Sequence, residues 1–321
     1  MPEKSSIIVA VQGGAGDVLA ATPMIRGMRK KYPDDELVVL ATHSYVLENN
    51  PNIDLLLPYQ DRSKTNEIYN KFISGTQKLR FFKEHFPYNS FQDEIGKRSK
   101  CLPEFLCNIY DVEYDGEHLD YYITPYEEAA ATAFMRQFQK PLILLHLTGV
   151  LPMKSFDLAQ MVPILEKLSS DYEFIQIGAA GEPVITGIHN ALGMPIRDTV
   201  SIMPHMKLCI LIESLFAHCS NALALRSVVI FQSTSPEFFG YENHFNVWDT
   251  GGCKSWPCNR PIGSLNKFLP AYRDLEKGDA LPWMCPDPLC SKMTAKDLEV
   301  TIWEAINYTA KPIAAAEPAE D

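Results

Sequence analysis

The stretch IIVAVQGGAGDVLAATPMIRGMRKKYP, residues 7–33, decides the fold class. The apolar run Ile7–Val11 predicts a buried strand, and Val18–Lys31 has the pattern of a helix with a basic last turn. A cluster of glycines separates the two elements. A strand, a glycine-rich turn and a helix in this order are typical of the first unit of a parallel α/β sheet.

The same alternation continues along most of the chain. Strands are predicted at Glu36–Ala41 and Asp54–Pro58, with a short helix near Tyr45–Asn49, whereas residues 61–113 have a helical and aromatic pattern. A second alternating series begins with PLILLHLTG and runs to SVVIFQSTSP. The chain is therefore predicted to be an α/β protein with two Rossmann-like domains and an interdomain cleft. The expected divisions are 1–135, 136–310 with a cysteine-rich loop at about 249–292, and a tail at 311–321.

Composition excludes several classes of protein. The 321 residues are 46% hydrophobic and 21% charged, which is normal for a globular protein of two domains. The formal net charge of -11 disfavours a nucleic-acid partner, although the basic stretch Arg62–Lys100 is either a solvated helix face or a groove for an anionic acceptor. No apolar run is long enough to span a membrane, and no signal-peptide cleavage site follows the first strand, so we expect a cytoplasmic protein.

The glycine cluster raises the hypothesis of a dinucleotide-binding protein. Gly13, Gly14 and Gly16 do not have the full G-x-G-x-x-G spacing, and no carboxylate follows the second predicted strand near Ala41–Ser44. The dinucleotide hypothesis therefore fails, and the glycines are explained by a tight turn. Asp17 is not explained in this way. It is either a cap of the following helix or a general base that faces the cleft.

Five segments, in order along the chain, resemble one known family. The segment GDVLAATPMIRGMRKKYPDDELVVLATHSYVLENNPNIDLLLPY, residues 16–59, resembles the N-terminal signature of glycosyltransferase family 9, the heptosyltransferase family. Similar motifs of that family recur as LDYYITPYEEAAA, LLHLTGVLPMKSFDLAQMVPILEKL, QIGAAGEPVI and IESLFAHCSNALALRSVVIFQSTSP. The resemblance covers roughly residues 7 to 310.

The resemblance implies a GT-B fold and a glycosyltransferase that inverts the anomeric centre without a catalytic metal. It implies a nucleotide-sugar donor, ADP-linked as in heptose transfer, bound mainly by the C-terminal half. The implied acceptor is a glycan or glycolipid such as lipopolysaccharide core, bound by the N-terminal half. A protein of this kind is expected in the cytoplasm, with peripheral contact at the inner face of the membrane.

The resemblance also assigns roles to particular residues. Asp17 matches the family's general base, and Lys154 matches the lysine that contacts the donor phosphates, where charge grows in the transition state. The further donor-binding candidates are Thr148, Gly149, Glu213, Ser214, His218 and Thr234, and the backbone amides of Gly14, Ala15 and Gly16 form a candidate turn for an anionic group. Without the match, Lys154 is a solvated lysine and His218 a buried helix histidine.

The chain departs from the family pattern at Glu213 and Leu215, which stand where the family has aspartate and glycine. A longer acid moves its oxygens outward, and a leucine blocks close approach to the backbone. One alternative hypothesis is therefore a drifted protein of the same fold that binds a nucleotide or glycan without turnover. Another is a glycosyltransferase with a protein or a nucleobase as its acceptor.

Two pairs of cysteines follow the last predicted strand. Cys253 and Cys258 have four residues between them, and so do Cys285 and Cys290. Such knuckles indicate a structural zinc or iron site, while free thiols or two disulfides remain the alternatives. The other four cysteines lie in apolar or helical segments and are predicted to be small core residues.

Overall fold

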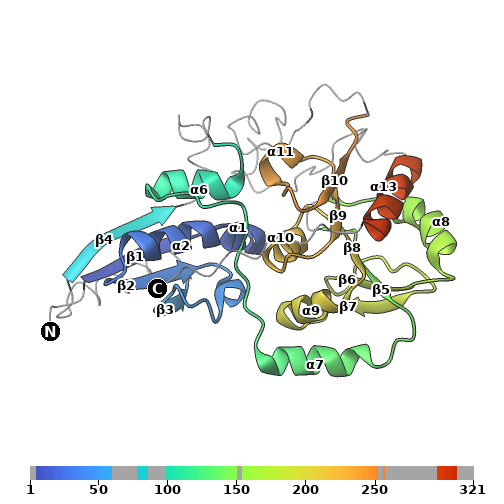
Figure 1. Cartoon of the computed structure of the whole chain (residues 1–321), viewed down its shortest axis with the longest axis horizontal. Helices are drawn as coiled ribbons and strands as arrows, with labels where there is room; N and C mark the ends of the chain where they lie inside the picture. Colours follow the sequence, from blue (N-terminus) through green and yellow to red (C-terminus); the bar gives the residue numbers. More distant parts are fainter. Residues whose placement is uncertain are drawn as a thin grey trace, which may run out of the picture.

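The computed structural model describes residues 5–59, 78–85, 99–149, 154–251, 256 and 295–308. These residues form two parallel sheets, one from each half of the chain, which lie side by side along the long axis of the molecule (Figure 1). Every strand pair in both sheets is parallel. The α/β class predicted from the sequence is confirmed.

The N-terminal half contains a four-stranded sheet. Its elements are β1 (Ser5–Val11), α1 (Ala15–Ala20), α2 (Thr22–Lys31), β2 (Glu36–Ala41), η1 (Ser44–Leu47), β3 (Leu55–Pro58), β4 (Lys78–His85) and α6 (Leu102–Tyr110). The strand order is β3-β2-β1-β4, and β1 pairs with β2 from Ser6 opposite Glu36 to Val11 opposite Ala41. Alternate residues of β1 enter different hydrophobic clusters, so both faces of this strand are buried, as in other parallel sheets.

The C-terminal half contains a six-stranded sheet with the order β10-β9-β8-β5-β6-β7. Its strands are β5 (Leu142–His146), β6 (Glu173–Gly178), β7 (His189–Leu192), β8 (Leu208–Ile212), β9 (Ser227–Phe231) and β10 (Phe245–Trp248). Its helices are α8 (Leu158–Leu168), α9 (Ile196–Ile202), η3 (Met203–His205), α10 (Leu215–Ala222), α11 (Pro236–Phe239) and α13 (Ala295–Asn307). α8 and α13 share a hydrophobic cluster with one face of β5, β8 and β9.

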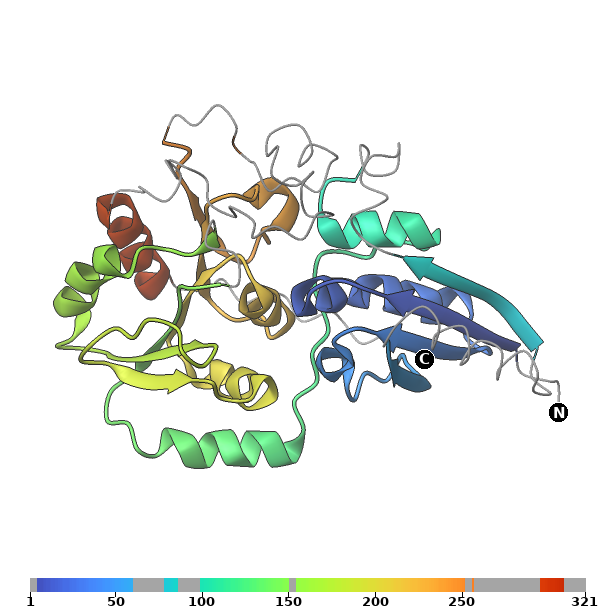
Figure 2. The same ribbon diagram turned by 180° about the vertical axis from the view of Figure 1, so that it is seen from behind.

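Helix α7 (Pro125–Met135) lies between the two sheets in the sequence and runs below α9 in the structure (Figures 1 and 2). Thr124 and Glu127 form a capping box at its start, and Pro125 occupies the first turn, where no backbone donor is needed. These residues define the start of α7 at Pro125. The domain division expected between residues 135 and 136 falls at the last residue of α7 and stays a prediction.

Contacts between α1 and α10 and around Arg197 are among those that hold the halves together. α1 packs against α10, and Gly16 allows this because a Cβ at that position would lie only 2.6 Å from Cδ2 of the His218 side chain. On α9, Arg197 donates to the carbonyl of Tyr45 in η1 at 2.9 Å and also pairs with Glu127 of α7. The guanidinium of Arg197 lowers the pKa of Glu127 to about 2. The two halves are therefore joined both by packing and by a charged contact.

Some of the predicted elements are wrong in detail. The predicted helix Val18–Lys31 consists of two helices that meet at Ala21, because Pro23 has no N–H for the carbonyl of Leu19, which accepts from the Thr22 hydroxyl instead. The helical pattern expected for residues 61–113 is interrupted by the strand β4. The elements β7, α9, η3, α11, β10 and α13 were not predicted.

The structure tests the predictions for four of the cysteines, but not those for the paired cysteines or for most of the basic stretch. Cys107, Cys209 and Cys219 are buried free thiols, as predicted, and Cys101 is half-buried. The paired cysteines Cys253, Cys258, Cys285 and Cys290 lie outside the described residues, and so does most of the stretch Arg62–Lys100. Within the described ranges no cluster of His, Cys, Asp and Glu is arranged to hold a metal ion. No helix in this part of the chain is long and apolar enough to cross a bilayer.

Candidate functional site

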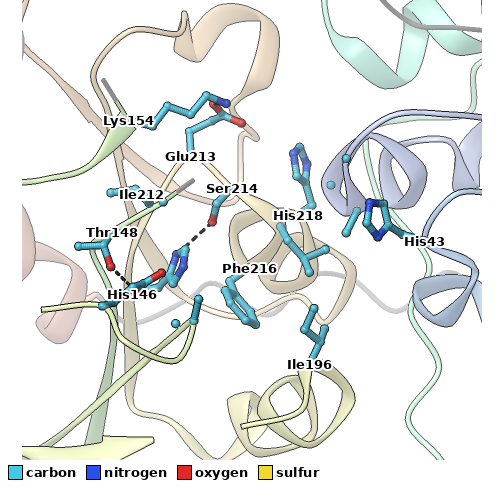
Figure 3. Close-up of a pocket in the computed structure, with 18 of the residues that line it drawn as sticks. His43, His146, Thr148, Lys154, Ile196, Ile212, Glu213, Ser214, Phe216 and His218 are labelled. Carbon is cyan, nitrogen blue, oxygen red and sulfur yellow. Dashed lines mark hydrogen bonds and ion pairs between the residues drawn. The ribbon is translucent and has the colours of Figure 1, made fainter. Parts of the chain in front are cut away.

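A cavity of about 550 Å³ lies where the two halves meet. It is lined by residues that directly follow β1 and β2 in one half and β5, β6, β7 and β8 in the other. Ligands of parallel α/β sheets bind at these carboxyl ends of the strands. The volume is within the usual range for a site that holds a small molecule. Figure 3 shows side chains of both halves that face this space.

The turn after β1 forms the wall of the cavity on the side of the N-terminal half. Gly13 has a φ of +135°, which other residues rarely adopt, and Gly14, Ala15, Gly16 and Asp17 line the cavity. The amide of Gly14 donates to Oδ2 of Asp17 at 2.8 Å. Asp17, the third residue of α1, thus caps the helix by accepting from the backbone of the N-cap residue Gly14, and it lines the cavity as well. The Gly14 amide, which was expected to bind an anion, donates to this carboxylate.

Lys154 and Glu213 form the main charged contact on the opposite wall. Nζ of Lys154 lies 2.5 Å from Oε2 of Glu213, which follows β8 (Figure 3). The same ammonium lies 5.9 Å from the centre of the Phe239 ring. Burial would raise the pKa of Glu213, but the charge of Lys154, together with hydrogen bonds from Lys154 and Thr234, outweighs burial, so the pKa is lowered and the carboxyl is ionised. The cation predicted to meet a diphosphate is therefore held by a carboxylate of the protein itself.

Three further polar residues of the cavity, Ser214, His146 and His218, have hydrogen-bond partners. The hydroxyl of Ser214, at the N-cap of α10, lies 3.1 Å from Nδ1 of His146 at the end of β5 (Figure 3). His218 is on the same helix, and its Nδ1 lies 2.5 Å from the hydroxyl of Tyr241. Burial lowers the pKa of both His146 and His218 to about 4, so both rings are neutral near pH 7.

The turns after β5 and β6 complete the wall. The hydroxyl of Thr148 donates to the carboxylate of Glu182, which follows the glycine turn after β6. Gly149 fits closely against β8, because a Cβ there would lie 3.1 Å from Cδ1 of Ile212. A carboxylate that follows the second strand of a Rossmann-like unit is suited to bind the hydroxyls of a ribose.

Comparisons with known proteins agree with this architecture. No family model matches the sequence, and neither does any curated protein. A solved structure described as a family 9 glycosyl transferase of Veillonella parvula is similar, with a TM-score of 0.72 and 15% identity, and the match covers 95% of this chain and 98% of that chain. The chain has the fold of family 9 glycosyltransferases.

Two other solved structures share this glycosyltransferase fold. TibC, an iron-containing dodecameric heptosyltransferase of enterotoxigenic E. coli in complex with ADP-D-beta-D-heptose, matches with a TM-score of 0.66 and 15% identity over 94% of this chain and 76% of that one. ADP-heptose LPS heptosyltransferase II of E. coli matches with a TM-score of 0.63 and 11% identity over 94% of this chain and 98% of that one.

The glycosyltransferase fold brings most of the predicted site residues together. Asp17, Thr148, Gly149, Lys154, Glu213, Ser214 and His218 all line the cavity, together with Gly14, Ala15 and Gly16. Thr234 follows β9 in the sequence, is buried, and is not among the lining residues that the structure describes. Its assignment to the donor therefore stays a prediction.

Three polar residues that line the cavity were not predicted from the sequence as site residues. They are Glu182, His146 and His43. Glu182 and His146 belong to motifs that were recognised in the sequence but given no role. His43 follows β2, and its Nδ1 lies 3.3 Å from the Tyr45 hydroxyl. No motif of the sequence identifies His43. It reaches the cavity because β2 lies beside β1 in the sheet, so the residues that follow the two strands lie close together.

The buried histidines predict how stability depends on pH. In the unfolded chain His218 has a pKa near 6.5, and in the folded state the value is about 4, so the unfolded chain binds more protons between these values. The stabilisation is complete above pH 6.5 and is lost as the pH falls toward 4, by about 1.4 kcal/mol per pH unit for each such histidine.

This dependence is measured by urea unfolding between pH 7 and pH 5. His218→Asn removes the titrating group, and its amide oxygen can still accept from the hydroxyl of Tyr241. We expect the variant to lose less stability between pH 6 and pH 5 than the unsubstituted protein, by about 1 kcal/mol. Equal losses in the two proteins would show that His218 is not held neutral by the fold.

Proposed function

We propose that the chain is an inverting glycosyltransferase that moves a sugar from a nucleotide-sugar donor, ADP-linked, to a hydroxyl of a glycan acceptor such as lipopolysaccharide core. The observation that carries the proposal is the arrangement of the cavity. A carboxylate, Asp17, is on the wall from the N-terminal half, and a cation, Lys154, is on the wall from the C-terminal half. Inverting transfer needs a base and a stabilised leaving group on opposite sides of the sugar.

The donor is assigned to the C-terminal wall. Glu182 would accept from the ribose hydroxyls, and the ammonium of Lys154 would bind the diphosphate, whose negative charge increases as the bond to the sugar breaks. The carboxylate of Glu213 and the hydroxyl of Ser214 would contact the sugar and the phosphates. Because Lys154 supplies positive charge to the leaving group, no catalytic metal is assigned to the reaction.

The acceptor is assigned to the N-terminal wall. Its hydroxyl attacks the anomeric carbon from the face opposite the diphosphate, while the carboxylate of Asp17 takes the proton of that hydroxyl. The hydrogen bond from the Gly14 amide fixes the orientation of this carboxylate. The products are the inverted glycoside and a nucleoside diphosphate. We assign the reaction to the cytoplasm, with a glycolipid acceptor at the inner face of the membrane.

The names of the structural neighbours support the choice of donor. TibC is described in complex with ADP-D-beta-D-heptose, and heptosyltransferase II is named for ADP-heptose and lipopolysaccharide. These descriptions concern proteins that are at most 15% identical to this chain. They guide the first ligands to be tested.

One observation favours a second candidate, a protein of the same fold that binds a nucleotide or glycan without turnover. Lys154 already has an ionic partner in Glu213, and Asp17 already caps α1. Both groups have structural partners that an enzyme would have to share with its substrates. Turnover separates the two candidates, because the second predicts ligand binding with no release of nucleoside diphosphate.

The proposal is tested with a thermal-shift panel of ADP-, UDP-, GDP- and CMP-linked sugars. We expect one nucleotide class to raise the melting temperature by several degrees at millimolar concentration, because a ligand that binds the folded state stabilises it by mass action. We expect the ADP-linked sugars to have this effect. Absence of a shift with all four classes would contradict both the enzyme and the nucleotide-binding hypothesis.

A further inference from the structure

The described wall of the cavity carries more negative than positive charge. Asp17, Glu182 and Glu213 contribute carboxylates, whereas Lys154 is the single lysine or arginine among the described lining residues. The buried histidines of the cavity are neutral near pH 7 and add no positive charge. A diphosphate is itself strongly negative, so the carboxylates of this wall repel a ligand whose only group near them is a diphosphate.

The ion pair between Lys154 and Glu213 adds a second cost to the binding of a bare diphosphate. The side chain of Glu213 is 6% exposed, and its carboxylate lies 2.5 Å from the ammonium of Lys154. A diphosphate that draws the ammonium toward itself leaves Glu213 as a buried charge with a weaker partner. Buried charges that lose their partner are strongly unfavourable, because water cannot replace the lost contact.

A hydroxyl group of a sugar can compensate for this loss. A hydroxyl donates a hydrogen bond to a carboxylate, and such charge-assisted bonds are about twice as strong as neutral ones. The sugar of a nucleotide sugar is attached to the terminal phosphate, so it reaches the neighbourhood of Lys154 together with the diphosphate. A bare nucleoside diphosphate has no hydroxyl at that end of the molecule.

We propose that Glu213 makes the cavity discriminate between an intact nucleotide sugar and the bare nucleoside diphosphate left after transfer. This inference rests on the proposed function and concerns the same site. With the nucleotide sugar, a sugar hydroxyl takes the place of Lys154 as the donor to Glu213, and the ammonium binds the diphosphate. After transfer the hydroxyl leaves with the product glycoside, and Glu213 recovers Lys154, which promotes release of the nucleoside diphosphate.

Glu182 provides a matched control in the same cavity. Its carboxylate accepts from the Thr148 hydroxyl, and no described contact joins it to Lys154. The ribose that it is proposed to bind is present in the nucleotide sugar and in the nucleoside diphosphate alike. Substitution of Glu182 is therefore expected to change the affinity for both ligands by the same factor.

The experiment is isothermal titration of the full chain with ADP and ADP-glucose. The unsubstituted protein is expected to bind ADP-glucose at least about tenfold more tightly than ADP, which corresponds to the cost of one unsatisfied buried polar group. In Glu213→Gln, which has the same shape without the charge, ADP binding is expected to strengthen by about tenfold. The preference for ADP-glucose then falls to within about twofold, whereas Glu182→Gln keeps the original ratio.

Two results would overturn the inference while leaving the proposed function in place. The first is equal or tighter binding of ADP than of ADP-glucose by the unsubstituted protein, which needs no variant. The second is an unchanged ratio in Glu213→Gln, or the same change of ratio in Glu182→Gln. Absence of binding of ADP and ADP-glucose in all three proteins would overturn the inference and the proposed ADP-linked donor together.

Discussion

Asp17→Asn is expected to reduce glycosyl transfer by about 10²–10⁴-fold, the usual contribution of a positioned general base. The asparagine cannot take the proton of the acceptor hydroxyl. It retains a side-chain oxygen that accepts from the Gly14 amide, so the start of α1 is kept. The measurement is the initial rate of nucleoside diphosphate release, with a truncated lipopolysaccharide core as the acceptor and saturating donor.

Asp17→Ala separates the two roles of this residue. The alanine removes the base and also the acceptor of the hydrogen bond from the Gly14 amide. We therefore expect the same loss of rate and an additional loss of about 1 kcal/mol in the free energy of unfolding. Donor binding is expected to stay close to that of the unsubstituted protein in both variants. Transfer by Asp17→Asn at the original rate would contradict a catalytic role and leave the cap as the sole function of Asp17.

Lys154→Met is expected to weaken donor binding by about tenfold to a hundredfold, because it removes a charged hydrogen bond to the diphosphate. The same substitution leaves Glu213 buried without its cation. For fully buried pairs this costs about 3–5 kcal/mol, and the part of Lys154 that reaches solvent makes a smaller loss expected here. Calorimetric titration with the donor and urea unfolding measure the two effects separately.

The double variant Lys154→Met with Glu213→Gln distinguishes the two losses. Removal of the buried charge is expected to restore most of the stability, because an amide tolerates the missing cation better than a carboxylate does. Donor binding is expected to stay weak, because the double variant has no cation for the diphosphate. A double variant that recovers donor binding would show that Lys154 acts through Glu213 and has no contact with the donor.

Local sequence patterns were sufficient to predict most of the strands whose ends form the cavity. The apolar run that becomes β1, the glycine turn and Asp17 lie within a few residues of one another, so their pattern is visible in the sequence. β2, β5, β6, β8 and β9 are short apolar runs bounded by turn residues, and they were predicted for the same reason. The family resemblance added Lys154, whose surroundings in the sequence are those of an ordinary exposed lysine.

The failures concern elements and contacts that depend on distant partners. β4 has a charged sequence, KLRFFKEH, which hides the pattern of a strand, and it is the edge strand beside β1. The ion pair of Lys154 with Glu213 joins residues that are 59 positions apart. The contact of Gly16 with His218 joins the two halves of the chain. Such contacts follow from the packing of the sheets, and no local pattern encodes them.

The central claim is that the cavity holds a nucleotide sugar between Lys154 and Asp17. The most direct test is a crystal structure of Asp17→Asn grown with the nucleotide sugar that the thermal-shift panel selects. We predict the diphosphate within about 3 Å of Nζ of Lys154, with the anomeric carbon of the sugar facing the side chain at position 17. A nucleotide sugar bound elsewhere, or bound here with its sugar turned away from position 17, would contradict the account.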